Sequence, residues 1–100
     1  MHNCVFLSTD GTYEFKLLDH EKLEDILGKI TFVGAISECE AFAVGSLNSS
    51  REKINPFCKN EKYFEKNVRG NVILVGSNKM GEAMDLDCET VTSFMTSIAK

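Results

Sequence analysis

The chain has 100 residues, of which 43% are hydrophobic and 26% are charged, and its formal net charge is -4 at pH 7. This length allows one domain with a modest core, and this composition excludes a disordered segment. No apolar run approaches the roughly 18 to 20 residues of a membrane span, and the N-terminus lacks the basic and apolar stretches of a secretory signal. We therefore expect a single cytoplasmic domain over residues 1–100, with no membrane contact.

The first predicted element is a β-hairpin within residues 4–18. Two apolar-rich runs flank Thr9-Asp10-Gly11, and Asp-Gly favours a turn because both residues tolerate positive φ. In the second run, Tyr13, Phe15 and Leu17 alternate with charged residues. This alternation predicts a strand with one face toward the core and one toward water.

A short helix is predicted next, at about 21–27, from the residues that would cap its N-terminus. Asp19 can accept hydrogen bonds from the free N–H groups of the first turn, and Glu21 places negative charge at the positive end of the helix dipole. Leu18 and Leu23 can meet as a hydrophobic staple across this turn. The residues expected to face the core are Leu23, Ile26 and Leu27.

The middle of the chain predicts a second hairpin and then a loop. Residues 30–36 and 40–46 are rich in β-branched and aromatic side chains, and a polar segment between them is typical of a tight turn. Residues 47–56 have no apolar period, which indicates a surface loop.

A second helix is predicted from Pro56 to about Lys66. Proline suits the first position of a helix because its missing N–H would be unpaired there anyway. Phe57, Phe64 and Val68 would return to one side of this helix.

The last third of the chain predicts a strand at 71–76, a partner strand at 82–86 and a final helix. Leu86 and Asp87 repeat the arrangement of Leu18 and Asp19, so the final helix has the same kind of cap. Its inward stripe is expected to consist of Val91, Phe94, Met95 and Ile98. Together, these elements predict an α+β fold: an antiparallel sheet of about four to six strands built from hairpins, with two or three short helices packed mainly on one face.

Residues that could support catalysis or bind a metal are few. Cys4, Cys39, Cys58 and Cys88 contain no CxxC pair, and inside a cell we read them as buried, reduced thiols. His2 and His20 have no obvious partner in the sequence. The acidic run 85–89 is explained by the helix cap and lacks the further donors of a calcium loop. We therefore predict no catalytic residues, no metal site and no cofactor.

The strongest electrostatic feature lies between residues 51 and 69, which hold six basic side chains against three acidic ones. On the predicted helix, the three lysines would share one face, beside an aromatic ring. Such a face could bind phosphate, nucleic acid or an acidic protein, although a solvated helix face would look the same. The candidate binding residues are Arg51, Lys53, Lys59, Lys62, Tyr63, Lys66 and Arg69.

Several stretches together resemble a known group of proteins. They are "LEDILGKITFVGAI" at 23–36, Asn-Pro at 55–56, and "VRGNVILVGSNKMGEAMDLDCETV" at 68–91. These stretches resemble a family of small domains of unknown function from bacteriophages, mobile elements and large DNA viruses of algae. The resemblance implies structural roles for Gly70, Gly81 and Asp87, a viral or mobile-element origin, and no established activity.

Two functions are consistent with these features. The first is a small non-enzymatic interaction module, a viral accessory protein that binds a host or viral protein through residues 48–69 or an exposed strand edge. The alternative is a binder of nucleotide or nucleic-acid phosphate that uses the basic 51–69 region. A homodimer formed by strand pairing is left open.

Overall fold

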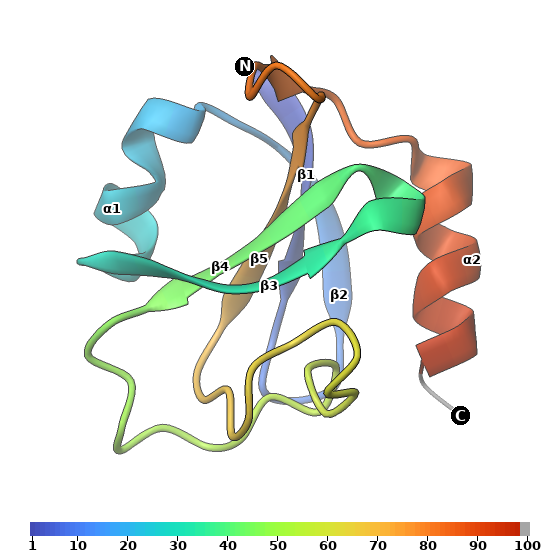
Figure 1. The fold of residues 1–100 in the computed structure, drawn as a ribbon. Helices are drawn as coiled ribbons and strands as arrows, with labels where there is room; N and C mark the ends of the chain where they lie inside the picture. The colour runs from blue at the N-terminus through green and yellow to red at the C-terminus, as the bar shows by residue number, and fades with distance from the viewer. Residues whose placement is uncertain (99–100) are drawn as a thin grey trace.

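A six-stranded antiparallel sheet forms the centre of the computed structural model, which describes residues 1–98 (Figure 1). The strands run in the order β2-β1-β5-β4-β3, and β6 pairs with the end of β5. Their bounds are β1 His2–Leu7, β2 Tyr13–Leu18, β3 Ile30–Ile36, β4 Ala41–Ser46, β5 Val72–Ser77 and β6 Ala83–Met84. The helical elements are η1 His20–Lys22, α1 Leu23–Leu27, η2 Ser37–Cys39 and α2 Cys88–Ile98. The predicted α+β class and both hairpins are confirmed.

Strand β5 occupies the middle of the sheet and pairs with β1, β4 and β6. Its first five residues are all buried, so the sheet is apolar on both faces at this position. Val72 and Leu74 belong to one core cluster, whereas Ile73 and Val75 belong to the other. A strand that is apolar on both sides needs cover on both sides.

The helices therefore divide between the two faces of the sheet, which corrects the expectation that they pack mainly on one face. On the α2 face, Val91, Phe94 and Met95 of α2 pack in the same cluster as Leu7 and Leu74 of the sheet. The side chain of Ile98, the fourth residue of the predicted stripe, lies outside the described part of the chain. On the α1 face, a smaller cluster gathers Cys4, Leu23, Val44, Ile73 and Val75. Figure 1 shows α1 and α2 on opposite sides of the strands.

Both predicted Asp caps form, the first at the start of the 3-10 turn η1 that leads into α1 and the second at the start of α2. The Asp19 Oδ1 atom accepts a hydrogen bond from the Glu21 N–H at 3.0 Å, and the Asp87 Oδ1 atom accepts one from the Glu89 N–H at 3.1 Å. Leu18 packs with Leu23 in one cluster in the way that a hydrophobic staple requires. The same local solution therefore starts both helical segments.

The predicted helix from Pro56 to Lys66 is wrong, because residues 47–71 form one long loop with turns and isolated bridges. The side chain of Asn55, which is fully buried, organises this loop. Its Nδ2 group donates to the Leu7 and Gly70 carbonyls at 3.1 and 2.9 Å, and its Oδ1 atom accepts from the Phe57 N–H at 3.0 Å. These bonds tie the residues around Pro56 to β1 and to the segment before β5, and the chain makes only a turn at Pro56 and Phe57 without continuing as a helix.

The loop nevertheless buries the side chains whose spacing had suggested a helix. Phe57, Phe64 and Val68 all belong to the core on the α2 face. Phe64 reaches it directly after a turn at 61–63, where it forms an isolated antiparallel bridge with Gly34 of β3. The prediction that these apolar residues lie in the core is thus confirmed, but they lie on a loop rather than on a helix.

Three apolar residues that were expected to face the core are exposed. Ile26 is exposed because α1 has only five residues and meets the sheet through Leu23 and Leu27. Tyr13 and Leu17 are 39% and 59% exposed, because β2 lies at the edge of the sheet. An edge strand has a neighbour on one side only, so its side chains are covered incompletely.

Replacing Asn55 by alanine is expected to lower the free energy of unfolding by about 2 to 4 kcal/mol, because two buried carbonyls and one N–H lose their partner. Chemical denaturation of the variant, compared with an Asn48→Ala control at an exposed loop position, measures this loss. Equal stability of both variants would contradict the role assigned to Asn55.

Candidate functional site

The candidate site begins where the 47–71 loop meets the outer edge of β3. The Ala35 N–H donates to the Tyr63 carbonyl at 2.9 Å, and the Glu65 N–H donates to the Val33 carbonyl at 2.8 Å. Gly34 makes this approach possible, because a Cβ atom there would collide with the Tyr63 carbonyl and lie 2.8 Å from Phe64 Cδ1. The register of β3 also shifts between Phe32 and Gly34, which is the signature of a β-bulge.

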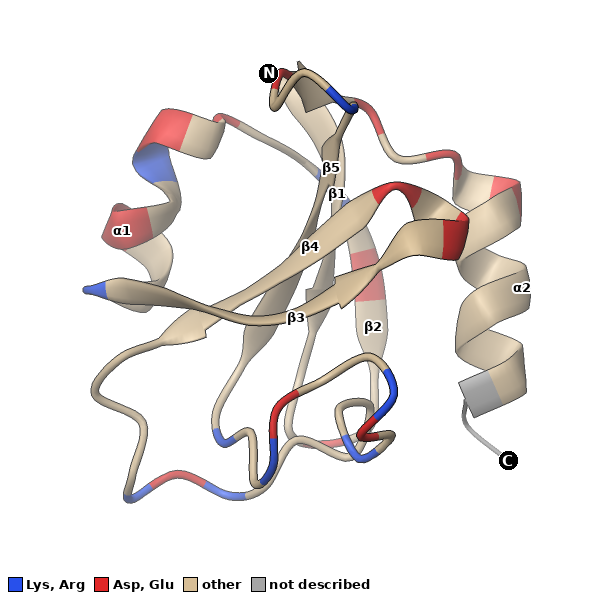
Figure 2. Ribbon diagram, in the orientation of Figure 1, with Lys and Arg blue, Asp and Glu red and all other residues tan. Residues whose placement is uncertain are grey.

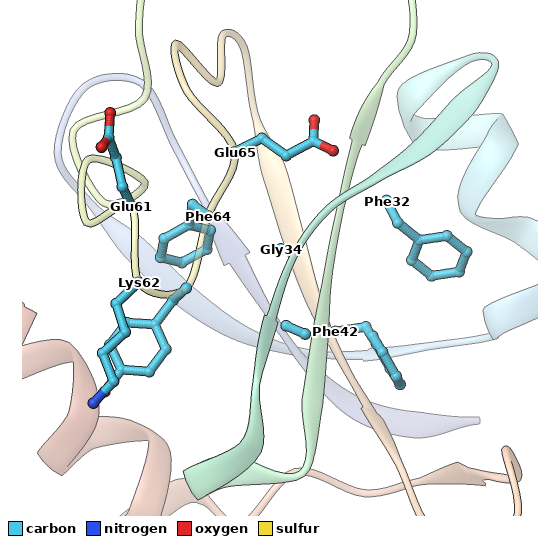
Figure 3. Close-up of a pocket in the computed structure, with 9 residues that line it drawn as sticks. Phe32, Gly34, Phe42, Glu61, Lys62, Phe64 and Glu65 are labelled. Atoms are coloured by element: carbon cyan, nitrogen blue, oxygen red, sulfur yellow. The ribbon is translucent and has the colours of Figure 1, made fainter.

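A shallow groove of about 600 Å³, called the β3 groove below, lies across this junction (Figure 3). Strand β3 passes through the middle of it, with Phe32 and Phe42 on one side and Lys62 and Phe64 on the other. A second hollow of about 450 Å³ shares Ala35, Phe42, Lys62 and Tyr63 with it and extends toward 77–79. The residues that line the β3 groove are Phe32, Gly34, Ala35, Phe42, Glu61, Lys62, Tyr63, Phe64 and Glu65.

Two of the three phenyl rings of the groove, those of Phe32 and Phe42, are exposed although they lie on the sheet. Phe32 is 65% and Phe42 is 40% exposed, and their ring centroids are 5.8 Å apart in a tilted, edge-to-face arrangement. Phe32 pairs with Val44, and Phe42 pairs with Val75, so both rings lie on the α1 face. The short helix α1 leaves this part of the face uncovered.

The opposite wall of the groove is fixed by Tyr63. Its ring packs edge-on against Phe94 of α2 with centroids 4.9 Å apart, and its hydroxyl donates to Glu38 Oε1 at 3.3 Å. The Lys62 Nζ atom lies 5.2 Å from the centre of the same ring. An aromatic wall with a cation at its rim can contact both an apolar side chain and a carboxylate.

The predicted basic residues do not converge on one surface. Because the predicted helix is absent, Lys59, Lys62 and Lys66 share no helical face. Lys59 and Lys66 line a small hollow together with Glu61 and Glu65, whereas Lys62 lines the β3 groove. Figure 2 shows basic and acidic residues interleaved along this loop.

The remaining candidate basic residues also keep local partners or face solvent. The Arg69 Nη1 atom donates to the Glu52 carbonyl at 3.0 Å, so this guanidinium supports the loop. Arg51 and Lys53 are exposed in the first part of the loop. Among the predicted binding residues, Tyr63 and Lys62 are therefore the two that line the β3 groove.

The sequence did not indicate a contact between Cys4 and His20. The Cys4 Sγ atom lies 3.6 Å from His20 Nε2, and the ring of His2 lies 5.2 Å from that of His20. Burial, reinforced by Asp85, raises the pKa of the Cys4 thiol to about 11, and burial followed by His2 lowers the pKa of His20. Both shifts favour the neutral thiol and the neutral imidazole over the thiolate and imidazolium pair.

The other cysteines divide by exposure. Cys58 is buried, and burial raises the pKa of its thiol to about 12. Cys39 is half-buried, and Cys88 is exposed at the start of α2, which corrects the expectation that all four are buried. Within residues 1–98, no three His, Cys, Asp or Glu side chains are grouped closely enough to bind a metal ion. Over the same range, no helix combines the length and the apolar character needed to cross a membrane.

Comparison with known proteins adds no relative: no family model, no curated protein and no solved structure matches this chain. The resemblance to small viral and mobile-element domains thus stays a prediction.

Replacing Gly34 by alanine is expected to separate Tyr63 and Phe64 from β3, because the new Cβ atom has no room beside their backbone. Overpacking of this kind lowers the free energy of unfolding by about 1 to 3 kcal/mol. Hydrogen exchange of the Ala35 amide, which bonds to Tyr63, is expected to accelerate. Unchanged stability and exchange would contradict the close packing described for this junction.

Thiol labelling of the folded protein at pH 8 is expected to modify Cys88 rapidly and to leave Cys4 and Cys58 unmodified. Cys88 is exposed, whereas the raised pKa values of about 11 and 12 keep the two buried thiols protonated. Mass spectrometry of the labelled chain identifies the modified positions, and a Cys88→Ser control should lose the rapid reaction. Rapid labelling that persists in the control would mean that another thiol is accessible.

Proposed function

We propose that this chain is a non-enzymatic interaction module that binds a protein partner through the β3 groove. The observation that carries the proposal is the pair of exposed rings, Phe32 and Phe42, beside a hollow with an aromatic wall. Large apolar side chains gathered on one exposed surface are typical of sites that another protein covers. This use of β3 and the 47–71 loop agrees with the two surfaces, a strand edge and residues 48–69, that the sequence suggested.

The shape and chemistry of the groove favour a protein over a small ligand. The groove is shallow and open, and strand β3 divides it, so a small molecule would stay largely in contact with water. A protein partner can cover both rings and reach the Lys62 ammonium group at the same time. Glu61, Lys62 and Glu65 supply the polar rim that usually surrounds the apolar centre of an interface.

The biological setting of the proposal comes from the sequence. The proposal includes the intracellular location that was expected from the sequence. A viral or mobile-element origin, with a host or viral protein as the partner, follows from the resemblance alone.

Phosphate binding by the 51–69 region is the competing function, and one observation favours it. Residues 51–69 include six basic residues, and Figure 2 shows the loop that carries them at one end of the molecule. Against it, Glu61 and Glu65 lie among the lysines, and the Arg69 guanidinium already has a carbonyl partner. A site that neutralises phosphates would also lose affinity steeply with added salt.

Affinity capture from cell lysate tests the proposal by comparing the wild-type chain with Phe32→Ala. The partner is expected to remain bound to the wild-type chain at about 0.5 M salt and after nuclease treatment, because an apolar contact depends little on screening. Truncation of a central aromatic residue typically costs about 2 kcal/mol of binding energy, so Phe32→Ala should weaken the partner's binding roughly 30-fold.

Met80→Ala is the matched control, since Met80 is also an exposed large apolar residue but does not line the groove. It should retain the partner. Equal recovery with Phe32→Ala and wild type would remove the groove from the proposal. Nucleic acid retained only at low salt would favour the phosphate-binding alternative instead.

A further inference from the structure

Strand β2 forms one outer edge of the sheet, and among residues 1–98 no other strand pairs with its outer side. It pairs with β1 alone, over Tyr13–Leu18. Apart from the β1–β2 ladder, no hydrogen bond within residues 1–98 reaches the backbone of Tyr13, Phe15 or Leu17. The other edge strand, β3, differs because Tyr63 and Glu65 already bond to part of its outer side.

The pairing pattern fixes which backbone groups of β2 point outward. In an antiparallel pair, residues that exchange hydrogen bonds alternate with residues that do not. The Ser8 N–H donates to the Thr12 carbonyl at 2.9 Å, so Glu14, Lys16 and Leu18 are the positions bonded to β1.

The bonds of Asn3 confirm this alternation, because it lies opposite Leu17 and directs its backbone away from β2. Its carbonyl accepts from the Leu86 N–H, and its N–H donates to Asp85 Oδ1. The N–H and C=O groups of Tyr13, Phe15 and Leu17 therefore face the open side.

The sequence of β2 is complementary to itself when it is read in the antiparallel direction. If two copies pair about a two-fold axis at Phe15, Glu14 of each copy lies opposite Lys16 of the other. Tyr13 of each copy then lies opposite Leu17 of the other. Because Phe15, Tyr13 and Leu17 are the positions with outward backbone groups, every one of those groups finds a partner in this register.

The side chains of β2 are arranged as this register requires. Glu14 and Lys16 share one face of the strand, where the Lys16 Nζ and Glu14 Oε2 atoms lie 3.8 Å apart and the Lys16 and Glu14 side chains are 43% and 67% exposed, respectively. Tyr13 and Leu17 share the other face and are 39% and 59% exposed. Charges on an edge strand normally prevent pairing. Here the two-fold axis turns them into opposite-charge pairs, which stabilise adjacent strands.

We propose that two copies of this chain associate through their β2 strands, in antiparallel register about Phe15, to form one continuous sheet. Each copy contributes the same surface, as a closed two-fold dimer requires. The two β3 grooves lie at the opposite edges of the joined sheet and stay free. The dimer is therefore independent of the proposed partner binding and would present two partner sites.

Charge reversal at one position tests this register, because it brings like charges together at both symmetric contacts. Glu14→Lys is expected to weaken the dimer by about tenfold or more, and Lys16→Glu by a similar factor. An equimolar mixture of these two variants is expected to recover the dimer, since their charges are again opposite across the axis. Sedimentation equilibrium of the full chain over a wide range of concentrations measures each association.

Glu24→Lys is the matched control, because Glu24 is exposed on α1, away from β2, and its replacement changes the net charge by the same amount as Glu14→Lys. It should dimerise like the wild-type chain. A wild-type chain that stays monomeric at all concentrations would overturn the proposal, as would a Glu14→Lys variant that dimerises normally. A mixture that stays monomeric would also overturn the register about Phe15. Circular dichroism confirms that each variant is folded, and recovery in the mixture cannot arise from unfolded chains.

Discussion

The buried amide of Asn55 holds the long 47–71 loop against the end of the sheet. Its three side-chain hydrogen bonds join β1, the turn at Phe57 and the segment before β5. A loop of this length loses much conformational entropy when it is ordered, and only burial of side chains such as Phe57 and Phe64 offsets that loss. Because the loop completes the core on the α2 face and then covers part of β3, both the packing and the candidate groove depend on this one polar group.

Elements that depend on residues close together in the chain could be predicted from the sequence, whereas the 47–71 loop could not. The Thr9–Gly11 turn and the Asp19 and Asp87 caps each depend on residues within one or two turns of the chain, so short stretches of sequence specify them. The loop depends on Asn55 bonding to Leu7, which is far away in the chain. Nothing near Pro56 indicates that bond, and the residues there fit the start of a helix equally well.

The candidate site was harder to predict, because exposure is a property of the whole fold. Phe32 and Phe42 are large apolar residues of the kind that usually lie in a core, and they are exposed because β3 is an edge strand and the short α1 covers little of this face. Lys62 and Tyr63 were identified, but as parts of a helical face rather than as the wall of a groove. The open edge of β2 became visible only once the strand order was known.

The central position of β5 has a consequence for how the chain acquires its structure. The β1–β2 and β3–β4 hairpins are each formed by neighbouring residues, but they do not pair with each other; β5 lies between them. During synthesis, residues 2–46 leave the ribosome before β5, so we expect two separate hairpins to form first, each with an unpaired inner strand. The sheet is then expected to become one cooperative unit when residues 72–77 insert between them. Non-local pairing of this kind is slow, so the step that joins the hairpins comes late in folding.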